Sequence, residues 1–453
     1  MSNPGTLKER MNYEKSFDCV QCGYCLPACP TYETMETEKH SPRGRIQLMK
    51  LAAEGKIGLE ELEEPVGKCL GCMACMPVCP TNVQYDQMLE GAKRVIEDNK
   101  QKPVLQRTLE HSLLDTLIPS TGGMNTVGNL TWLYQKTGLQ KAAQKLRLST
   151  LAPLAMGEFE KVLPPQPSPK ERSARPVYRP AQQPEKARVA FFTGCVMDSM
   201  FFTINEQSME LLAIAGAGVV VPEEQTCCGA LHAHSGRHDK AVELAKQNIQ
   251  MLEELEVDYI VNNAGGCGAQ MVRYDHLFEE GTVWHERATA FKEKVKDITQ
   301  VLAELDSLRF TKPVEERVTY QPSCHMTNVQ RVTAAPRSLM QAIPGVELEE
   351  MNDPNFCCGS AGVYNLVQHE SSMKILDMKM KDAGSTKTST IVTTNPGCLL
   401  QMKYGAERAG TTAGCAFSGT SHGSRTGAKR RLMAGLDPMC DLKKKEYSNS
   451  IDM

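Results

Sequence analysis

The chain lacks a long apolar run. Nowhere do about 20 consecutive apolar residues occur, the length that a helix needs to span a bilayer. Its first residues, MSNPGTLKERMNYEK, are polar, so a secretory signal is not expected. The net charge is only −3, which gives no general attraction to nucleic acid or to an anionic membrane. These absences predict a cytoplasmic protein that does not bind nucleic acid. It would contact a membrane only peripherally, at the inner face and through a partner.

Cysteine, by contrast, is abundant: 18 occur among 453 residues. A reducing compartment keeps such thiols free, so metal or redox chemistry is the leading explanation for them. The cysteines sort by position, with eight between residues 19 and 79, four near 195–267 and four near 324–398. Two others, Cys415 and Cys440, follow no pattern, and we interpret them as incidental.

Two stretches near the N-terminus share one cysteine spacing. CVQCGYCLPACP begins at residue 19 and CLGCMACMPVCP at residue 69, and both follow C-x2-C-x2-C-x3-C-P. In bacterial ferredoxins three cysteines of such a run bind one cluster and the fourth binds the other cluster. A structural zinc site uses two separated pairs instead. We therefore predict two [4Fe-4S] clusters, the first held by Cys19, Cys22, Cys25 and Cys79, the second by Cys69, Cys72, Cys75 and Cys29.

The segment between the two stretches predicts a helix. SPRGRIQLMKLAAEGK (41–56) offers Pro42 as a helix start, followed by a broad apolar face. A helical spacer of this length is typical of an α-helical ferredoxin rather than a compact βαβ one. Two arginines at the helix start, Arg43 and Arg45, either neutralise cluster charge or are simply solvated.

An internal repeat follows a segment rich in proline. Seven prolines between residues 161 and 185 predict an extended linker. Beyond it, Cys195, the pair Cys227 and Cys228, and Cys267 recur as Cys324, the pair Cys357 and Cys358, and Cys398. Corresponding cysteines are offset by 129 to 131 residues, which indicates a duplication.

Each copy predicts parallel α/β layers. RVAFF, GVVVP and DYIVNN in the first copy match RVTY, GVELEEM and STIVTTN in the second as short strands. Ligands gather at the carboxyl ends of parallel strands, so four thiols per copy are expected to converge on one edge. They could bind zinc, bind an iron–sulfur cluster or form a redox disulfide. Adjacent cysteines suit neighbouring atoms of a larger cluster, which favours iron–sulfur.

Histidines and glycines near these cysteines have simpler interpretations. For His232, His234 and His325, hydrogen bonding is favoured over ligation. The glycines around Cys267 (GGCG, 265–268) do not fit a nucleotide-binding loop between a strand and a helix. We interpret them as room for the backbone to approach a cluster.

The two ferredoxin-type runs followed by two Cys…Cys-Cys-Gly…Cys modules resemble the iron–sulfur subunit of bacterial glycolate oxidase (glycolate dehydrogenase). The resemblance covers roughly residues 10–400, and CPTYETMETEKHSPRGRI, CCGALHAH and CCGSAGVY carry it most clearly. It implies partner subunits that bind FAD and oxidise glycolate to glyoxylate, while this subunit passes electrons towards quinone or another acceptor. It implies no FAD and no catalytic residue in this chain.

The repeat modules are also similar to the cysteine-rich CCG domains of heterodisulfide reductase, which hold noncubane clusters. There the last cysteine belongs to a C-x2-C. Here Cys267 is followed by Gly-Ala-Gln and Cys398 by Leu-Leu-Gln, so a fifth thiol is missing. The type and occupancy of any further cluster in the modules therefore stay open. Two alternatives also stay open: a thiol–disulfide redox protein, and the same relay role for D-lactate or glycerol 3-phosphate oxidation.

The expected fold class is α+β multidomain, with an N-terminal α-helical ferredoxin-like domain and two tandem α/β CCG modules. We expect the following order: ferredoxin at 8–100, with its motifs at about 10–40 and 60–90; helical connector at 101–160; Pro-rich linker at 161–187; first module at 188–312; second module at 313–404; irregular tail at 405–453.

Overall fold

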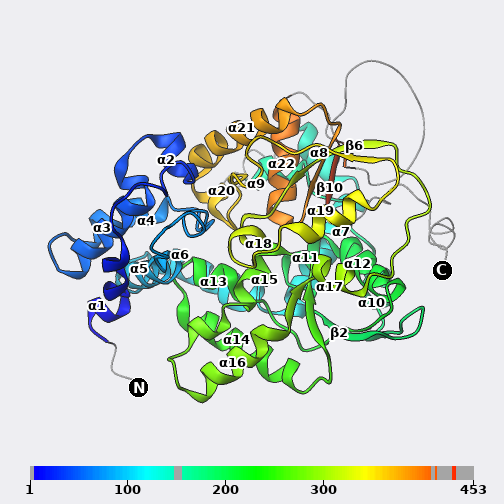
Figure 1. The fold of residues 1–453 in the computed structure, drawn as a ribbon, viewed down its shortest axis with the longest axis horizontal. Coiled ribbons are helices and arrows are strands. Elements are labelled where there is room, and N and C mark those ends of the chain that lie inside the picture. Colours follow the sequence, from blue (N-terminus) through cyan, green and yellow to red (C-terminus); the bar gives the residue numbers. More distant parts are fainter. Residues whose placement is uncertain (1–4, 147–155, 410–413, 416–430, 435–453) are drawn as a thin grey trace.

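A computed structural model describes residues 5–146, 156–409, 414–415 and 431–434 of the protein. Figure 1 shows a helical N-terminal part at one end of the molecule, drawn in blue, beside two units that each contain a sheet. The first of these units is drawn mainly in green and the second in yellow and orange. This arrangement is the one expected from the cysteine pattern.

The N-terminal part is built of short helices around two long cysteine loops. Its elements are α1 (Leu7–Arg10), η1 (Tyr13–Asp18), α2 (Pro30–Met35), η2 (Glu38–His40), α3 (Pro42–Ala53), α4 (Leu59–Gly67) and α5 (Tyr85–Asn99). The predicted spacer helix is α3: it begins at Pro42, and the Ser41 hydroxyl accepts a hydrogen bond from the backbone N–H of Gly44 at 2.9 Å. Met49, Leu62 and Met88 are fully buried in the core between α3, α4 and α5.

A helical connector leads to the first sheet. It comprises α6 (Val104–Glu110), the π-helix η3 (His111–Leu117), α7 (Thr121–Lys136), α8 (Leu139–Lys145), α9 (Met156–Glu160) and α10 (Pro169–Ser173). The interpretation of 161–187 as an extended linker is wrong in part. Pro169 is the first residue of α10, where proline is tolerated because that N–H has no helical partner. Arg172 in the same helix is buried and donates to the carbonyl of Asp198 at 2.9 Å.

The first sheet has the strand order β1-β3-β2-β4-β5. Its strands are β1 (Tyr178–Arg179), β2 (Ala187–Phe191), β3 (Ala217–Val220), β4 (Tyr259–Asn262) and β5 (Val295–Asp297), and only β1 is antiparallel to its neighbour. Around it lie α11 (Val196–Met200), α12 (Phe202–Ile214), α13 (Ala230–His234), α14 (His238–Glu253), α15 (Gly265–Met271), η5 (Tyr274–Leu277), α16 (Val283–Lys294) and α17 (Ile298–Leu305). The central strands are buried on both faces, as parallel strands covered by helices are.

The second sheet has the order β7-β6-β8-β10-β9, with every pair parallel. Its strands are β6 (Glu316–Gln321), β7 (Val346–Leu348), β8 (Thr390–Thr393), β9 (Gly414–Cys415) and β10 (Arg431–Ala434), and its helices are α18 (Cys324–Asn328), α19 (Ala334–Gln341), α20 (Tyr364–Val367), α21 (His369–Ser385) and α22 (Pro396–Arg408). All six predicted strands are present. The order β3-β2-β4 in one sheet matches β7-β6-β8 in the other, as a duplication requires.

We expected an irregular tail over 405–453, but part of this segment has regular structure. Helix α22 continues to Arg408, and β9 and β10 extend the second sheet. Cys440 and most of the remaining tail lie outside the described residues.

The two units pack against each other where α15 meets α18. A Cβ on Gly268 would lie 2.3 Å from the Gln330 side chain, and one on Gly265 would lie 2.4 Å from the Ser323 hydroxyl. Gly265 and Gly268 therefore make room for the other repeat, which corrects our interpretation of these two glycines as room for a cluster.

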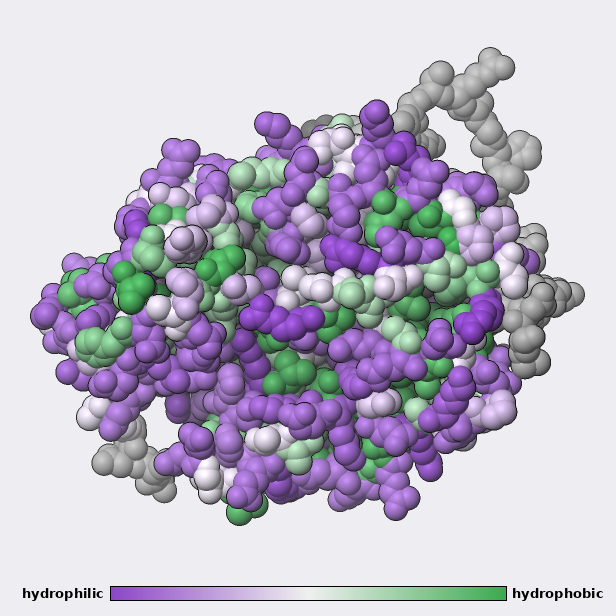
Figure 2. All heavy atoms as spheres, viewed as in Figure 1, coloured by the Kyte–Doolittle hydropathy of each residue, from purple (hydrophilic) through white to green (hydrophobic). Residues whose placement is uncertain are grey.

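The face drawn in Figure 2 is mostly hydrophilic, with apolar residues in separate small groups. In the described ranges we find no helix whose length and hydropathy would let it cross a bilayer.

Candidate iron–sulfur centres

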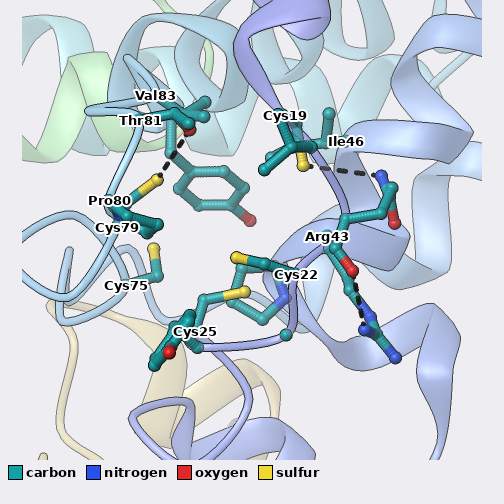
Figure 3. A pocket seen from close by; sticks show the side chains of 16 residues that line it. Cys19, Cys22, Cys25, Arg43, Ile46, Cys75, Cys79, Pro80, Thr81 and Val83 are labelled. Atoms are coloured by element: carbon teal, nitrogen blue, oxygen red, sulfur yellow. Dashed lines mark hydrogen bonds between the residues drawn. The ribbon is translucent and has the colours of Figure 1, made fainter.

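Four cysteines of the first predicted set border one cavity. Cys19, Cys22 and Cys25 come from the loop after η1, and Cys79 comes from the loop before α5. In Figure 3 these side chains, together with Cys75, surround a common space between the two loops. Cys79 lies near enough to Cys19 for its charge to raise the Cys19 pKa, although burial is the larger cause. The cavity thus gathers the four cysteines of the first predicted set and one cysteine of the second, and the ligand assignment stays a prediction.

The second predicted set is more deeply buried. Burial raises the pKa of Cys72 and of Cys75 well above the ordinary thiol value, and the charge of the neighbouring Cys29 raises both further. Cys29 comes from the first loop, so it has crossed to the three cysteines of the second loop. Its sulfur lies 3.2 Å from the Thr31 hydroxyl.

Positive charge compensates part of this buried thiolate set. Burial alone would raise the pKa of Cys69. The charges of Arg45 and Lys93, together with hydrogen bonds from Tyr85 and from the backbone of Gly71, outweigh burial and lower that pKa. Arg45 is only 1% exposed; it donates to the carbonyl of Pro65 at 2.7 Å and to the Thr31 hydroxyl at 3.0 Å. The alternative that Arg45 is a solvated helix-start residue is therefore wrong.

Arg43 behaves differently. Its side chain is 27% exposed and pairs with Glu38 at 2.7 Å, while one guanidinium nitrogen donates to the carbonyl of Gln21 in the first loop at 3.1 Å. Its charge lowers the pKa of Cys19 only slightly beside the effect of burial. Arg43 thus lines the cavity of the first cysteine set from a partly exposed position, whereas Arg45 is buried beside the second set.

The donor sets fit iron–sulfur clusters. Each set supplies four sulfur atoms from two loops, and the thiolates would be costly to bury without a cation. In the described ranges no three His, Cys, Asp or Glu side chains are grouped closely enough to hold a single metal ion. The sulfur atoms of the first set border a cavity instead.

The module cysteines also converge. In the first module the sulfur atoms of Cys195 and Cys227 lie 3.6 Å apart, and Cys228 interacts with Cys227 and Cys267. The second module has the same chain of interactions: Cys357 interacts with Cys324 and Cys358, and Cys358 also interacts with Cys398. A hydrogen bond with Cys227, together with burial, raises the pKa of Cys195 far above normal, and Cys357 does the same to Cys324. The sixteen cysteines from Cys19 to Cys398 are free thiols.

The three histidines make protein contacts. His232 Nε2 lies 2.7 Å from the carbonyl oxygen of Leu114 in η3. His325 Nε2 lies 2.8 Å from the carbonyl oxygen of Gly71. The ring of His234 lies 5.2 Å from that of His325, centroid to centroid. The contacts of His232 and His325 agree with the interpretation that these side chains form hydrogen bonds rather than bind a cluster.

The second cysteine loop docks on the second module. Besides the His325 contact, the Asn328 amide donates to the carbonyl of Cys72 at 2.9 Å. The charge of Cys324 raises the pKa of Cys72, second only to burial. The partners in this neighbourhood lie about 255 residues apart, so local sequence patterns carry no signal for it.

Comparison with known proteins agrees with this division. A family described as "4Fe-4S dicluster domain" matches residues 15–83, which implies two [4Fe-4S] clusters. A family described as "Glycolate oxidase iron-sulfur subunit, linker region" matches residues 105–163. A family described as "Cysteine-rich domain" matches twice, at 189–272 and 318–403.

Two curated relatives span most of the chain, and a third spans about half of it. A Bacillus subtilis protein named "Probable glycolate oxidase iron-sulfur subunit" is 47% identical over 89% of this chain and 92% of its own length. The Escherichia coli "Glycolate oxidase iron-sulfur subunit" is 26% identical over 85% of this chain and 89% of its own. An Exiguobacterium "Lactate utilization protein A" is 30% identical over 47% of this chain and 88% of its own. The chain belongs to the glycolate oxidase iron–sulfur subunit family.

Proposed function

We propose that this chain is the electron-transfer subunit of a complex in which an FAD-binding partner oxidises glycolate to glyoxylate, with the electrons leaving towards quinone or another acceptor. The observation that supports it best is the pair of crossed cysteine sets together with near full-length similarity to proteins named as glycolate oxidase iron–sulfur subunits. When bound, a [4Fe-4S] cluster accepts and releases one electron at a time. The chain performs no organic chemistry itself.

We assign the ligands as the sequence predicted them. Cys19, Cys22, Cys25 and Cys79 hold the first cluster, and Cys69, Cys72, Cys75 and Cys29 hold the second. The module cysteines, in two sets of four, hold further iron–sulfur clusters whose type is open. We keep the proposed division into ferredoxin, connector and two modules.

Exposure distinguishes the two ends of this arrangement. Cys22 is exposed, as are Val20 and Tyr24 beside it, at 62% and 67%. Cys72, at the other set, touches the second module. We therefore place the electron-donating partner at the Cys22 loop and the exit on the side of the modules.

D-Lactate is the second candidate substrate of the complex. Four relatives named "Lactate utilization protein A" match, although each matches only about half of this chain. Glycerol 3-phosphate stays an alternative within the same class. A thiol–disulfide reductase is the alternative from another class, and turnover of a disulfide by the isolated chain would favour it.

The test is anaerobic purification with the neighbouring subunits, followed by iron, sulfide and flavin counts and by substrate-driven bleaching of the iron–sulfur chromophore. We expect flavin in the partner only, at least eight irons per chain (four for each of two clusters), and bleaching by glycolate faster than by D-lactate or glycerol 3-phosphate. An iron-free preparation, or glycolate oxidation by this chain alone, would overturn the proposal.

A further inference from the structure

Two helices of the connector expose a row of leucines. Leu130 and Leu133 of α7, Leu139 of α8 and Leu146 at the end of α8 are between 49% and 68% exposed. Residues three or seven apart share one side of a helix, so the two leucines of each helix lie together. Helix α8 has no buried side chain, and α7 buries only two residues of its N-terminal half. We refer to the four leucines as the leucine face.

Other positions of the two helices hold them to the body of the protein. The Tyr134 hydroxyl donates to the carboxylate of Glu160 at 2.9 Å, and the Gln135 amide donates to the carbonyl of Pro164 at 3.1 Å. The Gln140 amide of α8 donates to the backbone carbonyl of Glu160, also at 3.1 Å. The leucine face is therefore presented to the outside by helices that are anchored elsewhere.

Only positive charge accompanies the leucine face. Residues 116–146 contain three lysines and neither aspartate nor glutamate, although the whole chain has a net charge of −3. Lys136, Lys141 and Lys145 are exposed, and none of them forms an ion pair with a residue that the structure describes. Lys136 follows Leu133 by three residues and so lies on the same side of α7. The net charge of the chain hides this local excess.

This composition favours a lipid surface over a protein partner. Lysine is depleted in protein–protein interfaces, whereas leucines with lysines beside them are typical of helices that lie in the membrane–water interface. Trp132, one of two tryptophans in the chain, is half-buried in α7, and tryptophan is enriched at that interface. The 16 residues of α7 extend about 24 Å, less than the roughly 30 Å of a hydrocarbon core, so the helix suits a position along the surface.

We propose that the leucine face, with Lys136, Lys141 and Lys145, docks on the surface of an anionic phospholipid bilayer. The leucines enter the boundary between head groups and acyl chains, and the lysines stay at the head groups, where their charge meets the lipid phosphates. The inference goes beyond the proposed function, because it concerns where the subunit sits, whatever the complex oxidises. It also replaces the expectation that membrane contact requires a partner.

Flotation of the full-length, cluster-containing chain with phospholipid vesicles tests the proposal without turnover. We expect binding to vesicles of equal parts phosphatidylglycerol and phosphatidylcholine, and at least tenfold weaker binding to phosphatidylcholine alone. Leu130→Ser/Leu133→Ser should lower binding to the anionic vesicles at least tenfold, with the iron content of the wild type as evidence of folding. Val283→Ser/Met378→Ser changes exposed apolar residues of α16 and α21; it is the matched control and should leave binding unchanged.

The lysines provide a second readout. Lys141→Gln/Lys145→Gln should lower binding to the anionic vesicles several-fold and leave the weak binding to phosphatidylcholine unchanged. Raising the salt to about 1 M, which shortens the screening length to about 3 Å, should weaken wild-type binding to the anionic vesicles in the same way. In the wild type, these vesicles should slow amide hydrogen exchange in residues 121–146 but not in α16.

The outcomes separate a lipid surface from a protein partner. If Leu130→Ser/Leu133→Ser floats as the wild type does, or both kinds of vesicle bind equally, the proposal is wrong. If that variant floats normally but no longer copurifies with the flavin subunit, the leucine face is a protein interface instead. Failure of glycolate to bleach the wild-type complex would overturn the proposed function alone, because flotation needs no substrate.

Discussion

The imidazole of His325 meets the second cysteine loop: its Nε2 atom lies 2.8 Å from the carbonyl oxygen of Gly71. His325 follows Cys324 of the second module, and Gly71 precedes Cys72 of the ferredoxin part. The contact therefore joins two cysteine sets through one hydrogen bond. Asn328, one helical turn further along α18, adds a second hydrogen bond to the carbonyl of Cys72.

Asn328→Ala should loosen this junction while leaving iron content unchanged. The variant leaves the Cys72 carbonyl without its side-chain donor, which costs about 1–3 kcal/mol for a buried group. We expect faster amide hydrogen exchange in residues 69–76 and a several-fold slower reduction of the final acceptor. Asn352→Ala removes the same side chain at an exposed site of the same module and is the control. Wild-type exchange in Asn328→Ala would show that the junction does not depend on this bond.

The crossed cysteine sets make a prediction about spectra. Cys79→Ser should abolish the same electron paramagnetic resonance signal of the reduced chain as Cys22→Ser, although residue 79 belongs to the second stretch. Cys29→Ser should abolish the same signal as Cys72→Ser. The comparison needs iron counts and spectra of the four single variants. The double variant Cys415→Ser/Cys440→Ser should lose no iron.

The assignment would be contradicted if Cys79→Ser and Cys72→Ser removed one and the same signal. Each run would then supply all four ligands of its own cluster. Such a result would leave the two-cluster content intact but would reverse the roles of Cys29 and Cys79.

Much of this site could be predicted because its ligands recur at fixed short spacings. Three cysteines spaced three residues apart, followed by Cys-Pro, specify a chemistry whatever surrounds them. The strands of the modules could be predicted for a similar reason, since short apolar runs such as YIVN must be buried between helices.

The rest depends on contacts between residues far apart in the chain. The burial of Arg45 follows from α4 packing over it, and the helix-start pattern around residue 45 gives no sign of this. The local pattern around Cys267 associates its glycines with a cluster, because it carries no information about the other module. Their real neighbours, Ser323 and Gln330, belong to the other repeat.

Arg45→Met should lower the reduction potential of the second cluster. The buried guanidinium stabilises the extra negative charge of the reduced state, so its removal favours the oxidised state. For charges about 7 Å apart at an effective dielectric constant near 20, the effect is roughly 100 mV. A redox titration followed by electron paramagnetic resonance measures it. Arg45→Lys should restore most of the potential, because the charge is kept.

Arg43→Met is the matched comparison at the first cluster. Arg43 is partly exposed and already paired with Glu38, so solvent and the carboxylate screen its charge. We expect a clearly smaller shift of the potential than at Arg45. An Arg45→Met shift equal to that of Arg43→Met, or of opposite sign, would contradict the role of the buried charge.

Asp297 should make the stability of the first module depend on pH. It lies at the N-terminus of α17, where one carboxylate oxygen accepts from the backbone N–H of Thr299 at 2.9 Å and the other is buried without a partner. Burial raises its pKa from 3.8 to about 6. Between these two pH values the folded state holds a proton that the unfolded state has lost. The free energy of unfolding therefore falls as the pH rises through this window, by about 3 kcal/mol at most, and this group adds no further change above it.

Asp297→Asn keeps the capping oxygen and removes the titration. Its melting temperature should match that of the wild type near pH 4 and exceed it by a few degrees at pH 7.5, with the difference growing between these values. Anaerobic thermal unfolding of the full-length, cluster-containing chain measures it. Asp306→Asn, at an exposed position just beyond the other end of α17, should show no such trend. If the melting temperatures of Asp297→Asn and the wild type differed by the same amount at every pH, the carboxyl would not hold its proton in the folded state. If this difference shrank as the pH rises, the folded-state pKa of Asp297 would be lowered instead.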